Sequence, residues 1–173
     1  MQTGRDFFLN EEQQLAVQTI LKEWDQKDKS VYLLHGVTGS GKTEVYMELI
    51  DFVRKQSKQA IFLIPEIALT YQMVLRFYQR FGSRVSILHS RMSAGERYDQ
   101  YEKAKNGEID IMIGPRSALF TPFSNLGIII VDEEHEESYK SETVPRYHAR
   151  ETAQRRAEME GAKLILGSAT PSV

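Results

Sequence analysis

Hydrophobic residues along the chain fall into six short runs, which are separated by longer segments of mixed polarity. The runs cover residues 31–34, 60–64, 85–88, 109–113, 128–131 and 164–166. Several of them are nearly continuous in β-branched residues and do not alternate with polar ones, which is typical of strands buried on both faces of a parallel sheet. The runs therefore predict six strands in one buried, mainly parallel sheet.

Apolar residues recur at helical spacing in the segments between these runs. The expected buried faces of the first three helices are Leu15, Ile20, Leu21 and Trp24; Val45, Leu49, Ile50 and Val53; and Leu69, Met73, Leu75 and Phe77. Asn10 suits the N-cap of the first helix, and Ser93 with Glu96 has the capping-box spacing that begins a fourth, through about residue 105. Residues 146–159 predict a further helix. This alternation predicts an α/β domain of three layers, α/β/α, with ligands beyond the carboxyl ends of the strands.

Composition narrows the class of protein and its chemistry. The 173 residues are 41% hydrophobic and 27% charged, close to the average of globular proteins, and they suit one domain over residues 1–173. The chain has no cysteine, which excludes disulfides, thiol catalysis and cysteine-bound zinc within it. The net charge of −2 means that a nucleic-acid contact needs a local basic patch.

Targeting signals are missing from the pattern. No apolar stretch approaches the roughly 20 residues that a membrane span needs, and the first residues lack the basic-then-apolar order of a secretory signal. We therefore expect a soluble domain of the cytoplasm with no membrane partner.

A glycine-rich stretch after the first run carries the clearest chemical signal. It fits the pattern G-x-x-x-x-G-K-[ST] with Gly36, Val37, Thr38, Gly39, Ser40, Gly41, Lys42 and Thr43. Such glycines allow successive backbone N–H groups to surround phosphate oxygens at the start of a helix. Lys42 is expected to reach the β- and γ-phosphates, and the Thr43 hydroxyl to bind Mg²⁺. The stretch predicts a site for a nucleoside triphosphate.

The fifth run leads directly into acidic residues. It is followed by Asp132, Glu133, Glu134 and His135, so that a strand delivers carboxylates at its carboxyl end. Asp132 is expected to hold the Mg²⁺ ion, and Glu133 to orient or deprotonate the attacking water. The second carboxylate favours ATP hydrolysis over phosphoryl transfer to a small acceptor, and the sequence contains no Asn/Thr-Lys-x-Asp element for guanine. The expected catalytic residues are Glu133, Asp132 and Lys42.

The tetrad 132–135 resembles the DExH box of superfamily 2 helicases, whose lobes have the RecA-like P-loop NTPase fold, and other stretches follow that family's order. Gln13 resembles the glutamine that reads adenine, because an amide can pair with both the N6 and N7 edges of that base. Residues 65–70 and 114–118 resemble motifs that face a single strand, and residues 167–171 resemble a coupling motif. In these stretches and the tetrad, the resemblance implies DNA-binding or coupling roles for Glu66, Thr70, Arg116, Ser117, His135, Ser168 and Thr170.

One segment narrows the resemblance. Residues 138–140 and 145–150, together with 36–46 and 116–123, are similar to the primosomal replication-restart helicases, the PriA family (primosomal protein N′). In that family the segment after the acidic box senses single-stranded DNA and couples it to ATP hydrolysis. The residues that suit base stacking or phosphate contacts are Tyr139, Lys140, Arg146, Tyr147, His148 and Arg150.

The resemblance implies the first motor lobe of an ATP-dependent 3′→5′ DNA helicase that acts in replication restart at stalled forks. ATP and Mg²⁺ are then its cofactors, and zinc is bound elsewhere in the full chain. The implied partners are single-stranded and forked DNA and, for the full-length protein, primosome proteins. The sequence stops soon after the sixth run, so we expect an excised, monomeric fragment. Without the arginines of a second lobe, which contribute about 10³–10⁵ in rate, such a fragment should hydrolyse ATP very slowly.

Two alternatives stay open at this point. The chain could come from another superfamily 2 enzyme, such as a RecG-like fork remodeller, a restriction translocase or an RNA helicase, although residues 145–150 argue against it. It could also be a regulatory ATP-binding switch that assembles partners without unwinding. Stacking and phosphate contacts do not distinguish DNA from RNA, so that preference rests on the resemblance alone.

Overall fold

The computed structural model describes residues 9–34, 41–133 and 146–168. Its strands are β1 (Val31–Leu34), β2 (Gln59–Leu63), β3 (Val85–Ile87), β4 (Ile111–Gly114), β5 (Leu126–Glu133) and β6 (Lys163–Ser168). Its α-helices are α1 (Glu11–Lys22), α2 (Gly41–Lys55), α3 (Tyr71–Phe81), α4 (Ala94–Lys105) and α6 (Arg146–Glu160). Short 3₁₀ turns are η2 (Glu66–Ala68), η3 (Gly82–Arg84) and η4 (Arg116–Phe120). Every strand that the sequence predicted is present, but the predicted burial was wrong for β1, the outermost strand, where Val31 and Leu33 are 43% and 57% exposed.

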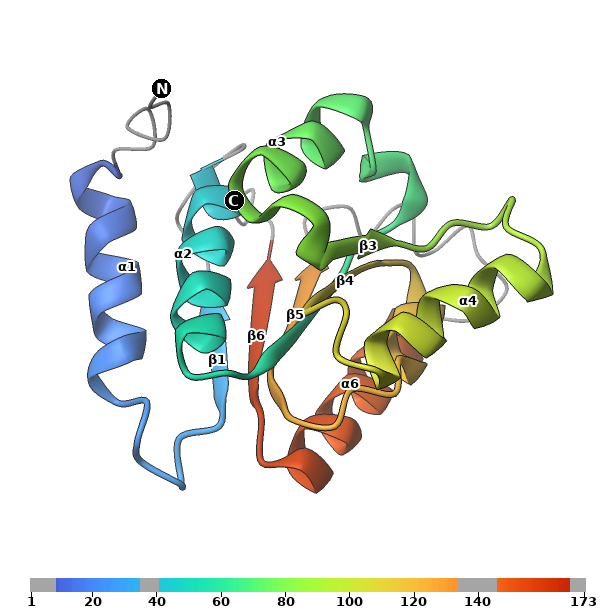
Figure 1. Ribbon diagram of the computed structural model, residues 1–173. Coiled ribbons are helices and arrows are strands. Elements are labelled where there is room, and N and C mark those ends of the chain that lie inside the picture. The colour runs from blue at the N-terminus through green and yellow to red at the C-terminus, as the bar shows by residue number, and fades with distance from the viewer. Residues whose placement is uncertain (1–8, 35–40, 134–145, 169–173) are drawn as a thin grey trace.

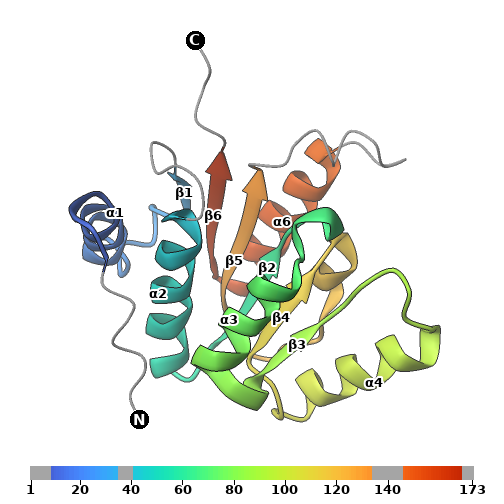
Figure 2. The ribbon, with the colours of Figure 1, turned by 90° about the horizontal axis from the view of Figure 1, so that it is seen from above.

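All six strands are parallel and form one sheet in the order β1-β6-β5-β2-β4-β3. Helices α1, α2 and α3 cover one face, and α4 and α6 cover the other (Figures 1 and 2). The predicted three-layer α/β/α architecture is confirmed. Because the strands are parallel, their carboxyl ends lie along a single edge, which we call the carboxyl edge.

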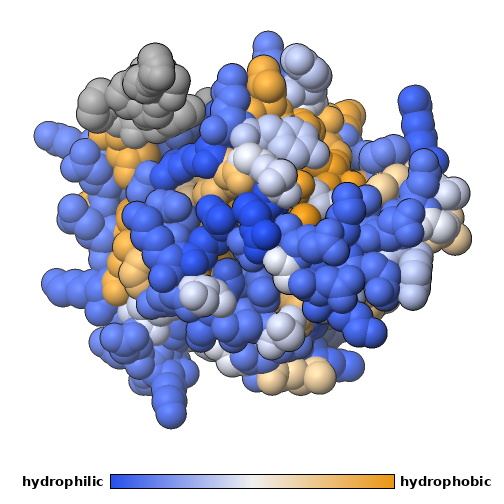
Figure 3. Space-filling view, viewed as in Figure 1, coloured by the Kyte–Doolittle hydropathy of each residue, from blue (hydrophilic) through white to orange (hydrophobic). Residues whose placement is uncertain are grey.

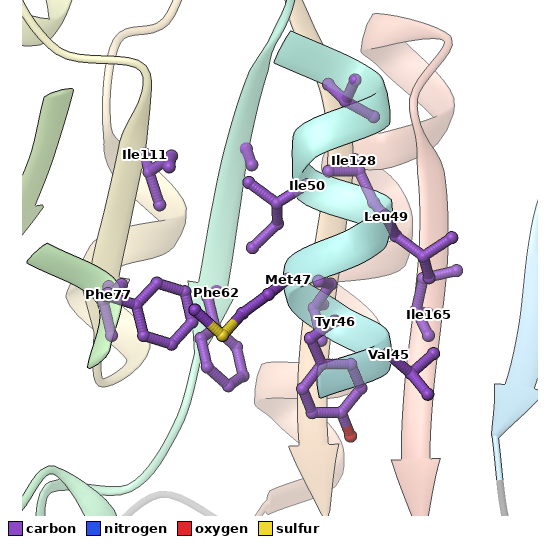
Figure 4. Close-up of a cluster of buried hydrophobic side chains, with 14 of the residues drawn as sticks. Val45, Tyr46, Met47, Leu49, Ile50, Phe62, Phe77, Ile111, Ile128 and Ile165 are labelled. Carbon is purple, nitrogen blue, oxygen red and sulfur yellow. The ribbon is translucent and has the colours of Figure 1, made fainter. Parts of the chain in front are cut away.

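Large side chains fill the layer between the sheet and helices α2 and α3 (Figure 4). The rings of Tyr46, Phe62, Phe77 and Phe81 follow one another with centroid distances of 5.2, 5.5 and 5.9 Å. The face predicted for the second helix is fully buried in α2: Val45, Leu49, Ile50 and Val53. Each such side chain contributes about 1.5–3 kcal/mol on burial, so this layer fixes α2 firmly against the sheet.

Small side chains fill the opposite layer where α6 crosses β5 and β6. Ala149, Ala153 and Ala157 are buried at intervals of four residues, which places them on one side of the helix. They pack in the same cluster as Ile129 and Leu164 of the sheet. Because alanine has no side chain beyond Cβ, the helix can lie close to these strands.

The helix starts follow the sequence better than the helix faces do. Asn10 caps α1, and Ser93 with Glu96 forms the predicted capping box of α4. Leu15, however, is 65% exposed on α1, and Leu75 is 38% exposed on α3, so both predictions of burial were wrong. The buried side of α1 consists of Gln13, Val17 and Ile20, and that of α3 of Phe77 and Phe81.

Two residues assigned to helix faces lie beside the helices and not within them. Trp24 follows the end of α1 and packs edge-on against Phe52, with 5.4 Å between ring centroids. Leu69 precedes α3 and closes the η2 turn. Within the described ranges, no helix combines the length and apolar character needed to cross a membrane.

Candidate functional site

Three neighbouring strands bring the predicted nucleotide-site segments to one row at the carboxyl edge. Leu34, the last residue of β1, lies opposite Gly167 of β6, and Gly167 lies opposite Asp132 of β5. Adjacent strands are about 4.8 Å apart, so the end of β1 and the backbone of Asp132 are separated by about 10 Å. Asp132 and Glu133 belong to β5 itself, whereas the sequence predicted that they follow the strand. The acidic pair and the segment that leads to α2 therefore start from the same row, Leu34–Gly167–Asp132, which we call the nucleotide row.

The first turn of α2 adds donors and buried polar side chains to this row. The first four N–H groups of a helix have no partner within it and favour an anion. The helix begins at Gly41, and its next residues, Lys42 and Thr43, are 1% and 6% exposed. Asp132 is 5% exposed. Charges this far from water interact strongly with other charges, which suits a small, highly charged ligand.

Gln13 connects the start of α1 to the start of α2. Its Nε2 donates to the carbonyl oxygen of Gly41 at 3.0 Å, and its Oε1 accepts from the Asn10 backbone N–H at 2.8 Å. Its own backbone N–H donates to Asn10 Oδ1 at 2.8 Å, which completes a capping box. The sequence did not reveal this structural role. Contact with adenine stays a prediction, for which the amide retains a second N–H on Nε2 and a second lone pair on Oε1.

Gly167 lies against the hydroxyl of Tyr46. A Cβ atom built at Gly167 would collide with that hydroxyl, so a residue larger than glycine requires the ring to move. Tyr46 is fully buried and comes from the second turn of α2. The glycine between the nucleotide row's two ends therefore allows α2 to pack closely over β6.

The loops after β2 and β3 are tied together by the carboxylate of Glu66. Its Oε2 accepts from the Ser90 backbone N–H at 2.5 Å. This hydrogen bond is the main reason that the pKa of Glu66 lies below its usual value, and the positive charges of His89 and Arg91 add to the effect. Thr70 caps α3 by accepting from the Met73 N–H at 3.2 Å. Both predicted DNA-contact residues thus also organise this corner.

Arg116 and Ser117 begin η4 directly after β4, which is the neighbour of β2 in the sheet. Both residues are half-buried. The Tyr101 hydroxyl of α4 donates to the Ser117 carbonyl oxygen at 2.8 Å, and burial raises the pKa of that tyrosine. The turn is therefore fixed beside the loop that carries Glu66, because Leu63 and Gly114 are paired in the sheet.

Two arginines of α3 form ion pairs with carboxylates of α2. Arg76 of α3 forms an ion pair with Glu44 in the first turn of α2. One turn later, Arg80 pairs with Glu48 at 2.7 Å. These pairs connect α2 to α3, and each arginine charge is balanced by a carboxylate.

The remaining predicted site residues lie outside the described ranges, are described by their backbone alone, or lie on α6. Those outside the described ranges are Gly36, Val37, Thr38, Gly39, Ser40, His135, Tyr139, Lys140 and Thr170. The backbone alone is described for Glu133, Arg146, Tyr147, His148 and Ser168. That backbone pairs Glu133 with Ser168 across β5 and β6. Arg150 is half-buried on α6.

A hollow of about 670 Å³ lies at the opposite, amino edge of the sheet, far from the predicted chemistry. Trp24, Lys58 and Lys163 contribute to its lining. The ammonium group of Lys163 donates to the carbonyl oxygens of Gln26 and Lys29, at 2.9 and 2.5 Å. Its role there is to close the turn before β1.

Comparison with known proteins gives a family match over nearly the whole chain. A family model described as "Type III restriction enzyme, res subunit" matches residues 6–173. The match includes every stretch for which the sequence predicted a nucleotide or nucleic-acid contact.

Curated relatives are similar over most of this chain and a small part of their own length. The replication restart protein PriA of Bacillus subtilis (strain 168) is 53% identical over 165 residues, covering 95% of this chain and 20% of that protein. PriA of Chlamydia trachomatis is 51% identical over 166 residues, covering 95% and 22%. The chain therefore spans about a fifth of the length of these relatives, and the predicted resemblance to the PriA family is confirmed.

Solved structures share the fold at low sequence identity. A structure of RecG bound to a three-way DNA junction matches with a TM-score of 0.67 and 24% identity, covering 97% of this chain and 22% of that one. The helicase domain of Pyrococcus furiosus Hef matches with a TM-score of 0.55 and 15% identity, covering 95% and 35%. Both likenesses concern the fold alone, and they agree with the RecA-like architecture predicted from the motifs.

Proposed function

The chain belongs to the family of type III restriction enzyme res subunits, and on that premise we propose that it is the ATP-binding motor lobe of a DNA helicase. The observation that carries this proposal is the row Leu34–Gly167–Asp132, which brings the end of β1, after which the chain leads to α2, within about 10 Å of the acidic strand end. The strong similarity to a fifth of PriA supports helicase activity over other uses of a nucleotide.

The residues of the row fit ATP and Mg²⁺. Mg²⁺ is commonly held by one or two protein oxygens together with phosphates and water, and Thr43 with Asp132 supplies such a pair. Lys42 is buried in the first turn of α2, where its charge can meet the β- and γ-phosphates. When bound, Mg·ATP supplies the phosphoryl group and the charge that stabilises its transfer to water.

Each residue then has a distinct role. The N–H groups of 36–43 bind phosphate oxygens, with Lys42 adding a positive charge and Thr43 and Asp132 orienting the metal. Glu133 holds the attacking water and accepts its proton. Gln13 contacts the adenine. Hydrolysis stays slow until a second lobe contributes its arginines.

The loops at the far half of the carboxyl edge bind single-stranded DNA in this proposal. Loops after β2 and β4 present backbone and side-chain donors to phosphates. The segment after the acidic box and the end of β6 couple DNA binding to hydrolysis. The proposed contacts are Glu66, Thr70, Arg116, Ser117, His135, Tyr139, Lys140, Arg146, Tyr147, His148, Arg150, Ser168 and Thr170.

The name of the relatives, replication restart protein, supports a finer biological assignment. We propose that residues 1–173 form lobe 1 of a longer cytoplasmic chain that binds zinc elsewhere. That chain moves 3′→5′ on forked DNA at stalled forks and assembles with primosome proteins.

Substitution of Glu133 tests the motor hypothesis. In the full-length protein that carries this segment, Glu133→Gln should lower DNA-stimulated ATP hydrolysis by about 10²–10⁴-fold, because the amide cannot accept the proton of the water. Binding of ATP, measured by fluorescence titration with a labelled analogue, should stay within about twofold of the wild type. The matched control is Glu158→Gln on the exposed side of α6, which should change neither quantity.

The same variant separates the competing functions. If the protein assembled its partners as a binding switch, Glu133→Gln would retain activity in a reconstituted restart reaction. A fork-remodelling enzyme would instead lose branch migration while the restart reaction stayed intact. Hydrolysis by the 173-residue chain alone at the rate of an intact helicase would contradict the need for a second lobe.

A further inference from the structure

A hollow of about 610 Å³ opens at the carboxyl edge between the start of α3 and the loop after β3. Its lining includes Glu66, Thr70, Tyr71, Ile87, His89 and Arg91. Tyr71 is the first residue of α3, and its side chain is 79% exposed. We call this hollow the Tyr71 hollow. It contains an aromatic ring that the domain's own packing uses very little.

Aromatic and apolar surface continues along α3 from this point. Hydrophobic and weakly polar residues gather over α3 in the space-filling view (Figure 3). Tyr78 is 42% exposed and lies two helical turns after Tyr71, so the two rings point to the same side of the helix, about 10 Å apart. Tyr78 lines an adjoining hollow of about 580 Å³ that shares Ile87 and His89 with the first. The two hollows form one path beside β3.

The far wall of the Tyr71 hollow is held in a fixed conformation. Glu66 Oε2 accepts from the Ser90 N–H, and the His89 Nδ1 atom accepts from the Arg91 N–H at 3.3 Å. The negative charge of Glu66 is therefore directed into the loop backbone. The Arg91 side chain is exposed and offers a positive group at the rim. A ligand would meet a preformed wall, an aromatic ring and one cation.

We propose that the Tyr71 hollow is a base-stacking site for single-stranded DNA, with the ring of Tyr71 as the platform and Arg91 as the phosphate contact. The inference rests on the proposed function, and it adds a contact to a base where Thr70 and Arg116 offer contacts to phosphates. Exposed aromatic rings in a partly basic groove are the usual way to bind a single strand without reading its sequence. Tyr71 is adjacent to Thr70, so the strand would continue directly from the phosphate contacts.

A peptide added to the free edge of β3 is the competing occupant. The Leu88 N–H donates to the Ile113 carbonyl oxygen of β4, and the Arg84 carbonyl accepts from Asp110 just before β4. The alternation of a parallel ladder therefore turns the backbones of Val85 and Ile87 outward. A peptide strand would pair with those groups and would not require Tyr71, which lies beyond the end of β3. The exposure of Tyr71 and the cation at Arg91 favour DNA.

Crosslinking tests the site directly. The 173-residue chain is irradiated with single-stranded oligothymidylate that carries 5-iododeoxyuridine, and the crosslinked peptide is identified by mass spectrometry. We expect the crosslink at Tyr71. In a parallel fluorescence-anisotropy titration, Tyr71→Ala should weaken binding by about 5- to 150-fold, which corresponds to the loss of one stacked base, whereas Tyr71→Phe should bind like the wild type.

The controls distinguish this inference from the proposed function. Tyr98→Ala removes another exposed tyrosine, on α4 and 61% exposed, and should not alter binding. Arg91→Ala should reduce the slope of log affinity against log salt by about 0.7, as for one phosphate of a single strand. Wild-type binding that is unchanged in Tyr71→Ala would overturn the stacking site alone. No binding of DNA by the wild type would overturn both proposals. If a peptide bound to the wild type, and this binding was lost in Val85→Pro but kept in Tyr71→Ala, the path would be assigned to a protein partner.

Discussion

The two halves of the carboxyl edge differ in how far their side chains are exposed to water. Over β1, β6 and β5, the side chains of Lys42, Thr43 and Asp132 are at most 6% exposed. Over β2, β4 and β3, Ile67 and Tyr71 are 72% and 79% exposed. The carboxyl edge therefore has a highly polar, buried half over β1, β6 and β5, which we call the closed half. Its other half, over β2, β4 and β3, is exposed and partly aromatic, and we call it the open half.

This difference corresponds to two kinds of ligand. A buried charged site interacts strongly with a small polyanion, because little water screens it. An open surface with aromatic rings suits a long polymer that must be bound and released in steps, because each contact is modest. The ion pairs Glu44–Arg76 and Glu48–Arg80 join the helices that begin at the two halves.

We expect the largest effect from a substitution in the closed half. Mg·ATP at about 100 times its Kd should stabilise the wild type by about 2.7 kcal/mol, which raises Tm by about 5–10 °C for a domain of this size. Lys42→Ala should abolish most of that increase, because the buried cation that meets the phosphates is lost. Thermal unfolding with and without nucleotide measures the difference.

Lys55→Ala is the matched control for this change, since Lys55 lies in the last turn of the same helix and its side chain is 75% exposed. It should retain the full nucleotide-dependent increase. Equal increases for Lys42→Ala and the wild type would show that the closed half is not the nucleotide site.

The second prediction concerns the packing beneath the closed half. Gly167→Ala should lower the free energy of unfolding by about 1–3 kcal/mol, because the new Cβ collides with the Tyr46 hydroxyl. Urea denaturation measures the loss. The double variant with Tyr46→Phe should recover part of it, since phenylalanine lacks the colliding oxygen; fully additive losses would contradict the contact.

A substitution at the amino edge of the sheet should affect neither half of the carboxyl edge. Burial alone would raise the pKa of Asp110, but hydrogen bonds from Arg84 at 2.9 Å and the charges of Arg84 and Arg54 outweigh it and lower that pKa. A depressed carboxyl pKa contributes stability that is present above the unfolded value of about 3.9 and is lost as the pH falls below it.

Asp110→Asn should therefore destabilise the protein at pH 7 by about 1–2 kcal/mol, between the values of exposed and buried ion pairs. The difference from the wild type should shrink as the pH falls below about 3.9. Urea denaturation at a series of pH values checks this, and a pH-independent difference would exclude the ion pair as its cause. Nucleotide and DNA affinities should not change.

The smallest expected effect is local to the open half. Glu66→Ala should cost about 0.5–1 kcal/mol, because the Ser90 N–H loses its acceptor near solvent. Hydrogen exchange at the Ser90 amide should accelerate, whereas Glu66→Gln, which keeps an acceptor oxygen, should restore protection. Unchanged exchange in Glu66→Ala would mean that the loop after β3 is held by other contacts.

Local signals made most of the fold predictable. Short apolar runs indicated every strand, because strands inside the sheet are buried on both faces and need apolar residues at nearly every position. Capping residues such as Asn10 and Ser93 marked helix starts, because they satisfy backbone groups within three residues. The buried face of α2 was predictable from its helical spacing, because its four apolar residues are all buried in the layer beside the sheet.

The features that the sequence did not predict depend on residues that are far apart in the chain. Leu15 has the same local spacing as a buried residue, but Gln13 occupies the buried side through a bond to Gly41, 28 residues away. The contact between Tyr46 and Gly167 and the bond between Glu66 and Ser90 have no sequence signature. The motifs of the nucleotide row could be identified in the sequence because they are local, and their role in binding stays a prediction, whereas the Tyr71 hollow exists only because two loops meet.

The capping box of α1 has a consequence for nucleotide selectivity. Both polar atoms of the Gln13 amide already hold a bond, to Asn10 and to Gly41. An amide nitrogen carries two N–H donors and an amide oxygen has two lone pairs, so each atom keeps one further position that a base could use. The bonds to Asn10 and Gly41 fix the plane of the amide, and a base would meet these positions already oriented.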